Sequence, residues 1–152
     1  MPNAKPLLCA ALICQDITDA EGFTSLHRIV DILTLNQSPP AGGPVFLATI
    51  RAYLLLKSGD FAGSGDVTFK MRFPPLPAGL GFSDPPDKYH ATLNGGEHGF
   101  ALRLTLNVPV VVFGVHYLDF YWNEDLIGTV PFRIAGTPGV TLPDYTKRQP
   151  PK

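Results

Sequence analysis

The residues best suited to chemistry are two histidines and a glutamate around a turn late in the chain. His90 and His98 flank Asn94-Gly95-Gly96, with Glu97 beside the second histidine. A hairpin at that turn would bring the three side chains together, and imidazoles with a carboxylate are a typical Zn²⁺ donor set. The chain lacks the His-x-His, Cys-x-x-Cys and His-Glu-x-x-His motifs. The sequence therefore favours ordinary loop histidines, and a small metal-dependent enzyme is the weaker hypothesis.

No other group matches a known catalytic arrangement. Ser64 lies between two glycines, without the Gly-x-Ser-x-Gly spacing that exposes a hydrolase nucleophile. Glu124 and Asp125 are adjacent at a predicted hairpin tip and have no assignable acid–base roles. His116 alternates with apolar residues, which favours a hydrogen-bonded core histidine over a catalytic base. The sequence predicts no catalytic residues, no metal and no cofactor.

Outward-facing tyrosines and charged residues on the predicted strands are more informative. Tyrosine and arginine dominate contact surfaces because they bury much area with few rotatable bonds or with strong hydrogen bonds. If the predicted strand 45–57 shares a sheet with the C-terminal hairpin, one outer face gathers a weak partner-binding set: Arg51, Tyr53, Tyr117, Asp119, Tyr121 and Arg133. A diagonal pair of Asp119 with Arg133 would occupy part of this face. The alternative is that these are simply good residues for a strand surface.

The hairpin is the clearest structural element. Alternate residues of a strand face opposite sides of a sheet. On that basis one face of the hairpin is apolar, and its residues are His116, Leu118, Phe120, Trp122, Leu126, Val130, Phe132 and Ile134. A three-residue loop, 123–125, opposes Trp122 to Leu126 and matches the apolar faces, whereas a two-residue loop would pair Phe120 with Thr129. Pro131 has no N–H and marks an edge strand or an outward position.

Further strands are predicted along the whole chain, separated by segments rich in glycine and proline. The predicted strands are 7–15, 23–35, 45–57, 67–73, 88–93 and 100–108. For 23–35 a helix is the alternative, because Thr18-x-x-Glu21 resembles a capping box. A turn is predicted at 59–65, and an irregular loop at 74–87, which contains five prolines.

This pattern predicts an all-β fold, an immunoglobulin-like antiparallel β-sandwich of seven to eight strands. The chain of 152 residues suits one domain, expected to span 1–135. The remainder, 136–152, is proline-rich and predicted to be partly extended or disordered.

Composition excludes some classes of function. The formal net charge is −1 and charged residues make up 16%, so no global field attracts nucleic acid or an anionic membrane. No apolar run approaches the roughly 18 residues of a membrane span. Cys9 and Cys14 lie in one predicted strand on opposite faces and cannot bridge each other, which favours a reducing compartment. Without a cleavage site after the first apolar run, the expected location is the cytoplasm.

Two short motifs carry a resemblance. They are Ala11-Leu12-Ile13-Cys14-x-Asp16-Ile17, and the segment Leu126-Ile127-Gly128-x-Val130-Pro131-Phe132-Arg133-Ile134 after an aromatic strand. In these motifs the chain resembles an uncharacterised family of small bacterial β-sandwich proteins, known only as a domain of unknown function. The resemblance covers roughly 7–134 and implies no substrate and no catalytic residues. The segment 19–35 departs most from the pattern of that family.

These observations predict a non-enzymatic binding or assembly module. It would meet a protein partner or another copy of itself through an outer sheet face or an edge strand, and low charge favours such association. A carbohydrate-binding β-sandwich is the first alternative, with Tyr53, Tyr117 or Tyr121 as stacking platforms. A metal-dependent enzyme that uses His90, Glu97 and His98 is the second.

Overall fold

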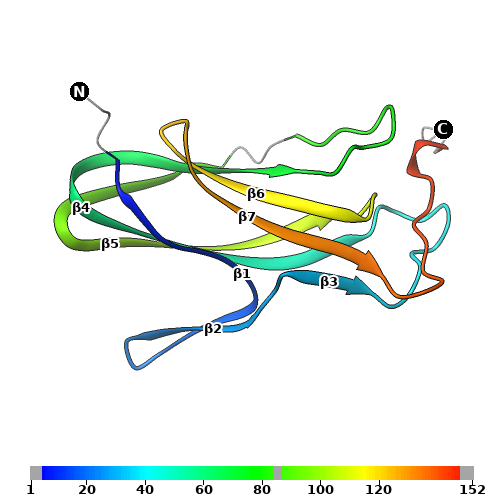
Figure 1. The fold of residues 1–152 in the computed structure, drawn as a ribbon, viewed down its shortest axis with the longest axis horizontal. Coiled ribbons are helices and arrows are strands. Elements are labelled where there is room, and N and C mark those ends of the chain that lie inside the picture. The colour runs from blue at the N-terminus through cyan, green and yellow to red at the C-terminus, as the bar shows by residue number, and fades with distance from the viewer. Residues whose placement is uncertain (1–4, 84–86, 148–152) are drawn as a thin grey trace.

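The computed structural model describes residues 5–83 and 87–147, and nearly all of its regular structure is β-strand (Figure 1). The strands are β1 (Leu7–Ala20), β2 (Phe23–Ile29), β3 (Ile32–Leu35), β4 (Leu47–Arg72), β5 (Tyr89–Pro109), β6 (Gly114–Trp122) and β7 (Asp125–Gly136). One 3₁₀ turn, Tyr145–Lys147, follows them. The prediction of an all-β fold is confirmed, and so is the preference for strand over helix in 23–35, which divides into β2 and β3.

All seven strands belong to one hydrogen-bonded sheet. Their order is β2-β1-β4-β6-β7-β3, and β5 pairs with β4 outside this path. The sheet is mixed rather than purely antiparallel as expected, because β3 runs parallel to β7 while the other pairs are antiparallel. The immunoglobulin-like sandwich therefore stays a prediction.

Strands β4 and β5 are far longer than expected because the glycine-rich segment at 59–65 bends the chain without ending the strand. The predicted turn at 59–65 is wrong, since β4 and β5 pair almost continuously from Leu47–Pro109 to Val67–Tyr89. Register shifts near Gly59 mark β-bulges. Glycine permits such bulges because it lacks a Cβ. Figure 1 shows both strands curving together at one end of the molecule.

The bulges change which alternate residues of β4 are buried. Even-numbered residues are buried from Ile50 to Ser58, and odd-numbered residues from Gly65 to Phe69. The first half of β4 pairs with β1, and the second half, Val67–Arg72, pairs with β6. Both halves contribute to a single core, whose largest fully buried side chains include Phe120, Phe132, Ile13, Leu54, Leu56 and Leu93.

The β6–β7 hairpin places its apolar residues on one face as predicted, but through a different turn and a β-bulge. Its turn has two residues, Asn123 and Glu124, both with positive φ (45° and 74°), so the predicted three-residue loop is wrong. A bulge between Phe120 and Tyr121 then restores the expected register, with Leu118 opposite Val130. The apolar face is buried as predicted except at Leu126, which is 51% exposed. One extra residue in the second strand compensates for the shorter turn.

The core continues past the predicted domain boundary at residue 135. Val140 and Leu142 pack against the core, and Tyr145 is buried. The Thr141 amide donates to Ser38 Oγ at 3.0 Å, which ties this segment to the loop after β3. The tail prediction for 148–152 lies outside the described residues.

Replacing Gly65 with alanine should destabilise the fold. A Cβ at Gly65 would lie 2.4 Å from Trp122 Cζ2, and Trp122 is buried and forms a T-shaped contact with Phe61. We expect Gly65→Ala to lower the free energy of unfolding by about 2 kcal/mol, measured by urea denaturation. Gly81→Ala is the control, because a Cβ there meets nothing within 4 Å. Equal stability of the two variants would contradict the close packing of Trp122.

Candidate functional site

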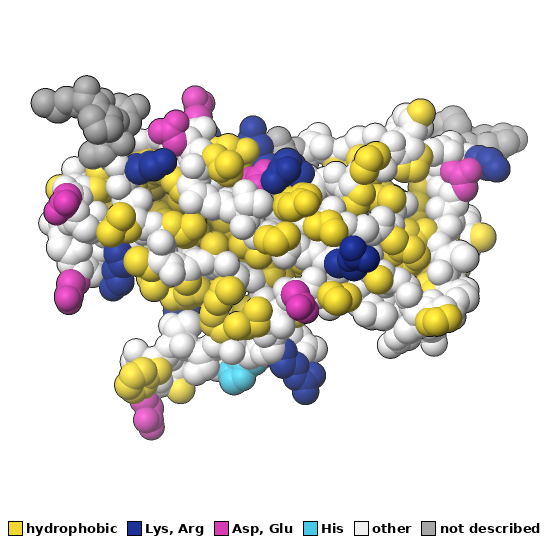
Figure 2. Space-filling model, viewed as in Figure 1, with side chains coloured by type: hydrophobic (Ala, Val, Ile, Leu, Met, Phe, Trp, Pro, Cys, Tyr) yellow, Lys and Arg dark blue, Asp and Glu magenta, His cyan; other side chains and the backbone are white. Residues whose placement is uncertain are grey.

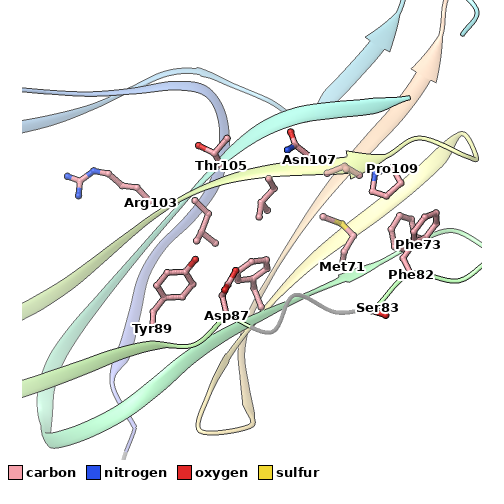
Figure 3. A pocket seen from close by; sticks show the side chains of 14 residues that line it. Met71, Phe73, Phe82, Ser83, Asp87, Tyr89, Arg103, Thr105, Asn107 and Pro109 are labelled. Atoms are coloured by element: carbon pink, nitrogen blue, oxygen red, sulfur yellow. The ribbon is translucent and has the colours of Figure 1, made fainter. Parts of the chain in front are cut away.

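An apolar cleft lies between the second half of β4 and the second half of β5 (Figure 3). Its volume is about 370 Å³, within the range of roughly 300–1,000 Å³ typical of ligand sites. The apolar lining comes from β4, the following loop and both ends of β5: Phe69, Met71, Phe73, Phe82, Tyr89, Leu104, Leu106 and Val108. Polar and other residues complete the rim: Ser83, Asp87, Arg103, Thr105, Asn107 and Pro109.

Aromatic rings form one wall of the cleft. Phe73 and Phe82 have ring centroids 5.0 Å apart, and Phe69 stacks on Tyr89 at 6.5 Å. Figure 3 shows Phe73 and Phe82 together at one end and Tyr89 toward the other. Phe82 is 38% exposed even though its ring contacts that of Phe73. The wall is therefore apolar surface that water reaches.

The edge of β5 forms the opposite wall. Seven consecutive residues, Arg103–Pro109, line the cleft. Successive residues face opposite sides of a sheet, so a cleft that contacts all of them must run along the strand's edge. Within the described residues β5 pairs only with β4. The edge of β5 that does not pair with β4 therefore faces the mouth of the cleft with its backbone N–H and C=O groups.

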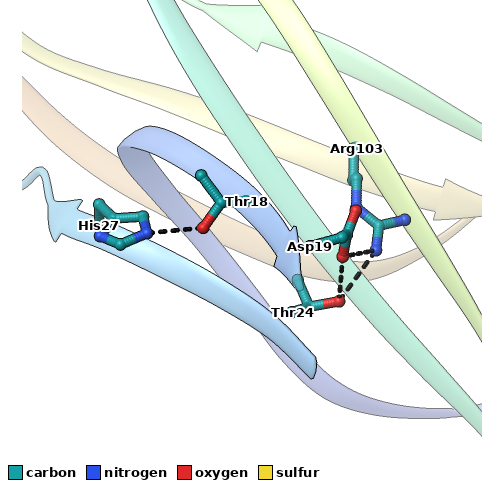
Figure 4. A network of polar contacts seen from close by, with 5 residues as sticks. All are labelled: Thr18, Asp19, Thr24, His27 and Arg103. Atoms are coloured by element: carbon teal, nitrogen blue, oxygen red, sulfur yellow. Dashed lines mark hydrogen bonds and ion pairs between the residues drawn. The ribbon is translucent and has the colours of Figure 1, made fainter. Parts of the chain in front are cut away.

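The charge at one end of this edge is balanced by the β1–β2 hairpin (Figure 4). Arg103 Nη2 donates to Asp19 Oδ1 at 2.8 Å and to Thr24 Oγ1 at 2.9 Å, and Thr24 Oγ1 donates to Asp19 Oδ1 at 2.6 Å. The hydrogen bond from Thr24, together with that from Arg103, lowers the pKa of Asp19. The end of the hairpin is therefore tethered to β5, two strands away from β1.

The structure divides the predicted partner-binding set into separate groups. Arg51 and Tyr53 lie on the first half of β4, opposite Thr105 and Arg103 of β5. Tyr117, Asp119 and Tyr121 lie on β6, which pairs with the second half of β4, and Arg133 lies on β7. Strand 45–57 and the hairpin do belong to one sheet, but β6 pairs with the second half of β4 and not with the half that carries Arg51 and Tyr53. The sequence pattern could not show which half pairs with β6, because alternation within a strand does not indicate its neighbours.

Asp119 is paired with Arg72 rather than with Arg133. Arg72 donates from Nε to Oδ2 at 2.5 Å and from Nη2 to Oδ1 at 3.1 Å, and Thr129 donates to Oδ1 at 2.6 Å. Asp119 is only 2% exposed. Burial raises the pKa of Asp119, but the hydrogen bonds from Arg72 and Thr129 outweigh burial and lower it. The carboxylate is therefore a structural anion, held by residues that the sequence had not identified.

The two β6 tyrosines are covered by cations. The Arg72 guanidinium lies 4.4 Å from the Tyr117 ring centroid, and Lys70 Nζ lies 5.3 Å from that of Tyr121. A sugar ring would have to displace these cation–π contacts to stack there. This arrangement disfavours Tyr117 and Tyr121 as carbohydrate platforms.

The predicted histidine site does not assemble. His90 Nδ1 lies 3.0 Å from Asp66 Oδ1, whereas His98 Nδ1 accepts the Asn94 amide at 3.4 Å. Glu97 contributes its backbone oxygen to Lys57. Across residues 5–83 and 87–147, no cluster of three potential metal ligands occurs.

His116 is a core histidine, as its alternation with apolar residues predicts. It is fully buried; its ring centroid lies 5.4 Å from that of Phe132, on which it stacks, and 5.6 Å from that of Phe73 in a T-shaped contact. Its Nδ1–H donates to Gly114 O at 3.1 Å, while Nε2 is buried without a hydrogen-bond partner among the described residues. Burial lowers the pKa of His116, and the bond to Gly114 only partly opposes this.

Comparisons with known proteins add no family. No family model matches the chain, and no curated protein matches it. The resemblance to an uncharacterised bacterial family therefore stays a prediction. No helix among the described residues is long and apolar enough to cross a membrane.

The cleft is the feature that sequence reasoning missed. Phe69, Phe73 and Leu106 lie in the predicted strands 67–73 and 100–108, but a strand prediction does not show whether another element covers a side chain. The available signal was Phe82, an aromatic residue in a proline-rich loop. Figure 2 shows hydrophobic side chains spread among charged ones on the viewed face, so exterior colouring alone does not single out a site there.

Removing Arg72 should cost far more stability than removing Arg133. Arg72→Met removes both guanidinium hydrogen bonds from the buried carboxylate and leaves the one from Thr129, so we expect the free energy of unfolding to fall by about 2 kcal/mol. Arg133→Met removes the same charge from an exposed position and should change stability by under about 0.5 kcal/mol. Urea denaturation at neutral pH measures both. A larger loss for Arg133→Met would instead support the pairing expected from sequence.

The buried His116 should make the protein less stable at mildly acidic pH. Its folded pKa is below the unfolded value of 6.5, so the unfolded chain binds the proton more readily. We expect the free energy of unfolding to fall below about pH 6.5, by at most about 1.4 kcal/mol per pH unit. His116→Phe should flatten this dependence in urea titrations between about pH 7.5 and about pH 5.5. The exposed His98→Gln control should keep it, and an unchanged slope in His116→Phe would refute the assignment.

Proposed function

We propose that the protein is a non-enzymatic binding module that recognises a partner protein through the cleft and the adjoining edge of β5. The observation that carries this proposal is the position of the cleft along seven consecutive residues of an edge strand. A site of this kind offers apolar surface and backbone hydrogen-bonding groups together. Polypeptides require both when they dock on a sheet.

The chemistry of the lining supports binding rather than catalysis. Among the described residues, the cleft lining contains two groups that are charged at neutral pH, Asp87 and Arg103, and Arg103 is engaged by Asp19. No histidine, cysteine or second carboxylate is among the described lining residues, so the lining offers no acid–base pair of the usual kind. The aromatic and aliphatic wall is the kind of surface that supplies binding energy by leaving water.

The proposal includes a two-layered, immunoglobulin-like arrangement of the two halves of the bent sheet. Support comes from the core that both halves share and from the close approach of β1 to β7. A Cβ at Gly128 of β7 would lie 2.5 Å from Leu8 Cδ2 of β1. In this arrangement β5 is the edge strand of both layers, and the cleft is the space between the layers along that edge.

We also propose that the module acts in a reducing compartment such as the cytoplasm. Cys9 is an exposed free thiol and Cys14 a buried one. Exposed free thiols persist where the surroundings are reducing.

The proposed function predicts protein capture that depends on the cleft. Leu106→Arg would place a charge in the cleft, whereas Leu126→Arg makes the same change at an exposed hairpin tip outside it. We expect quantitative affinity capture from native cells to lose at least one partner with Leu106→Arg and to keep it with Leu126→Arg. Circular dichroism would confirm that both variants are folded.

Two outcomes would alter or end the proposal. Identical sets of captured proteins for the wild type and Leu106→Arg would overturn it. The captured protein that Leu106→Arg loses could be another copy of this chain. In that case the partner is a second copy, and sedimentation of purified protein would show a concentration-dependent dimer.

A further inference from the structure

The β5 edge is the longest unpaired strand edge in the described part of the chain. The other ends of the sheet are β2 and β3, with seven and four residues, whereas β5 has 21. Proteins commonly protect such edges with charges, prolines or covering elements. Between Phe100 and Pro109 the β5 edge carries a single charge, Arg103, and a proline only at its end. Its backbone is therefore suited to accept another strand.

The side chains along this edge demand a particular pattern from an incoming strand. On the inner face Leu104 and Val108 are buried and Leu106 is half-buried, and across the cleft from them lie Phe69, Phe73 and Tyr89. On the outer face the row is Arg103, Thr105 and Asn107. A strand beside β5 would direct alternate side chains to these two environments. One set would be apolar and fill the cleft, and the other would be polar and remain in water.

The charge of the cleft adds a further condition. Arg103 is paired with Asp19, and no ion pair joins Asp87 to another residue of the described chain. Asp87 is exposed on the wall opposite β5. A basic side chain on the incoming segment would complement it, and its main contribution would be to orientation and association rate.

We propose that an extended segment of a partner protein adds as a strand to the β5 edge at Arg103–Pro109. The segment alternates apolar and polar residues and carries a basic residue toward Asp87. This inference rests on the proposed function and deepens it by naming the chemistry of the partner. Main-chain hydrogen bonds supply affinity in such complexes, and pockets for alternate side chains supply specificity.

The test uses a short fluorescein-labelled peptide in which leucine alternates with threonine between terminal lysines. Fluorescence anisotropy with the full-length protein should show saturable binding. A peptide of the same composition with its leucines contiguous should bind at least about tenfold more weakly, because only alternate positions reach the cleft. The same peptide with terminal glutamates should also bind more weakly. Leu106→Arg should abolish binding, and Leu126→Arg should not.

Backbone methylation separates strand addition from simple apolar insertion. An added edge strand uses the N–H groups of alternate residues only, because its other N–H groups face away from β5. Two peptides are therefore compared, one N-methylated at the leucines and one at the threonines. We expect one of them to lose at least about tenfold in affinity and the other to bind nearly as well as the parent.

Equal binding of the two methylated peptides, or no binding of the parent peptide, would overturn strand addition. Neither result would remove the proposed function, which depends on cleft-dependent capture of a protein. Conversely, capture unaffected by Leu106→Arg would overturn the proposed function even if the synthetic peptide binds.

Discussion

The constraint on which the structure depends is the continuous pairing of β4 with β5 through a bulged, glycine-rich bend. Because the bulges change the parity of the buried residues, even-numbered residues fill the core before the bend and odd-numbered residues fill it after. Two amphipathic segments with opposite parity can therefore belong to one strand without exposing an apolar face. The other strands add to this pair, with β1 on the first half and β6 on the second.

The same arrangement creates the candidate site. β4 and β5 bend together, and β5 is an edge strand along its whole length because it pairs only with β4 in the described residues. Its far half and the second half of β4 then enclose space that no described strand fills. The cleft is a consequence of the topology, and its apolar lining follows from the inward residues that the core pattern requires.

Charge pairing shows how neighbouring strands decide the environment of a side chain. Asp119 lies two residues from both Tyr117 and Tyr121, on the same face of β6, and was expected on an exposed face. Its carboxylate is satisfied by Arg72 of the adjacent strand β4, two residues beyond Lys70, which lies directly opposite Asp119. Thr129 lies opposite Asp119 on the other neighbouring strand, β7. The guanidinium both satisfies the carboxylate and covers Tyr117. A surface that the sequence described as a contact patch is thus partly occupied by its own intramolecular pairs.

Local pattern in the sequence determined the all-β class and the apolar face of the β6–β7 hairpin, because period-two burial is set by the strand itself. Tertiary structure alone decided that 45–57 and 67–73 are one strand, that the hairpin turn has two residues and a compensating bulge, and which half of β4 adjoins β6. It also decided the candidate site. A cleft depends on which inward residues lack a covering element, and that depends on pairings between segments distant in sequence, which no local period records.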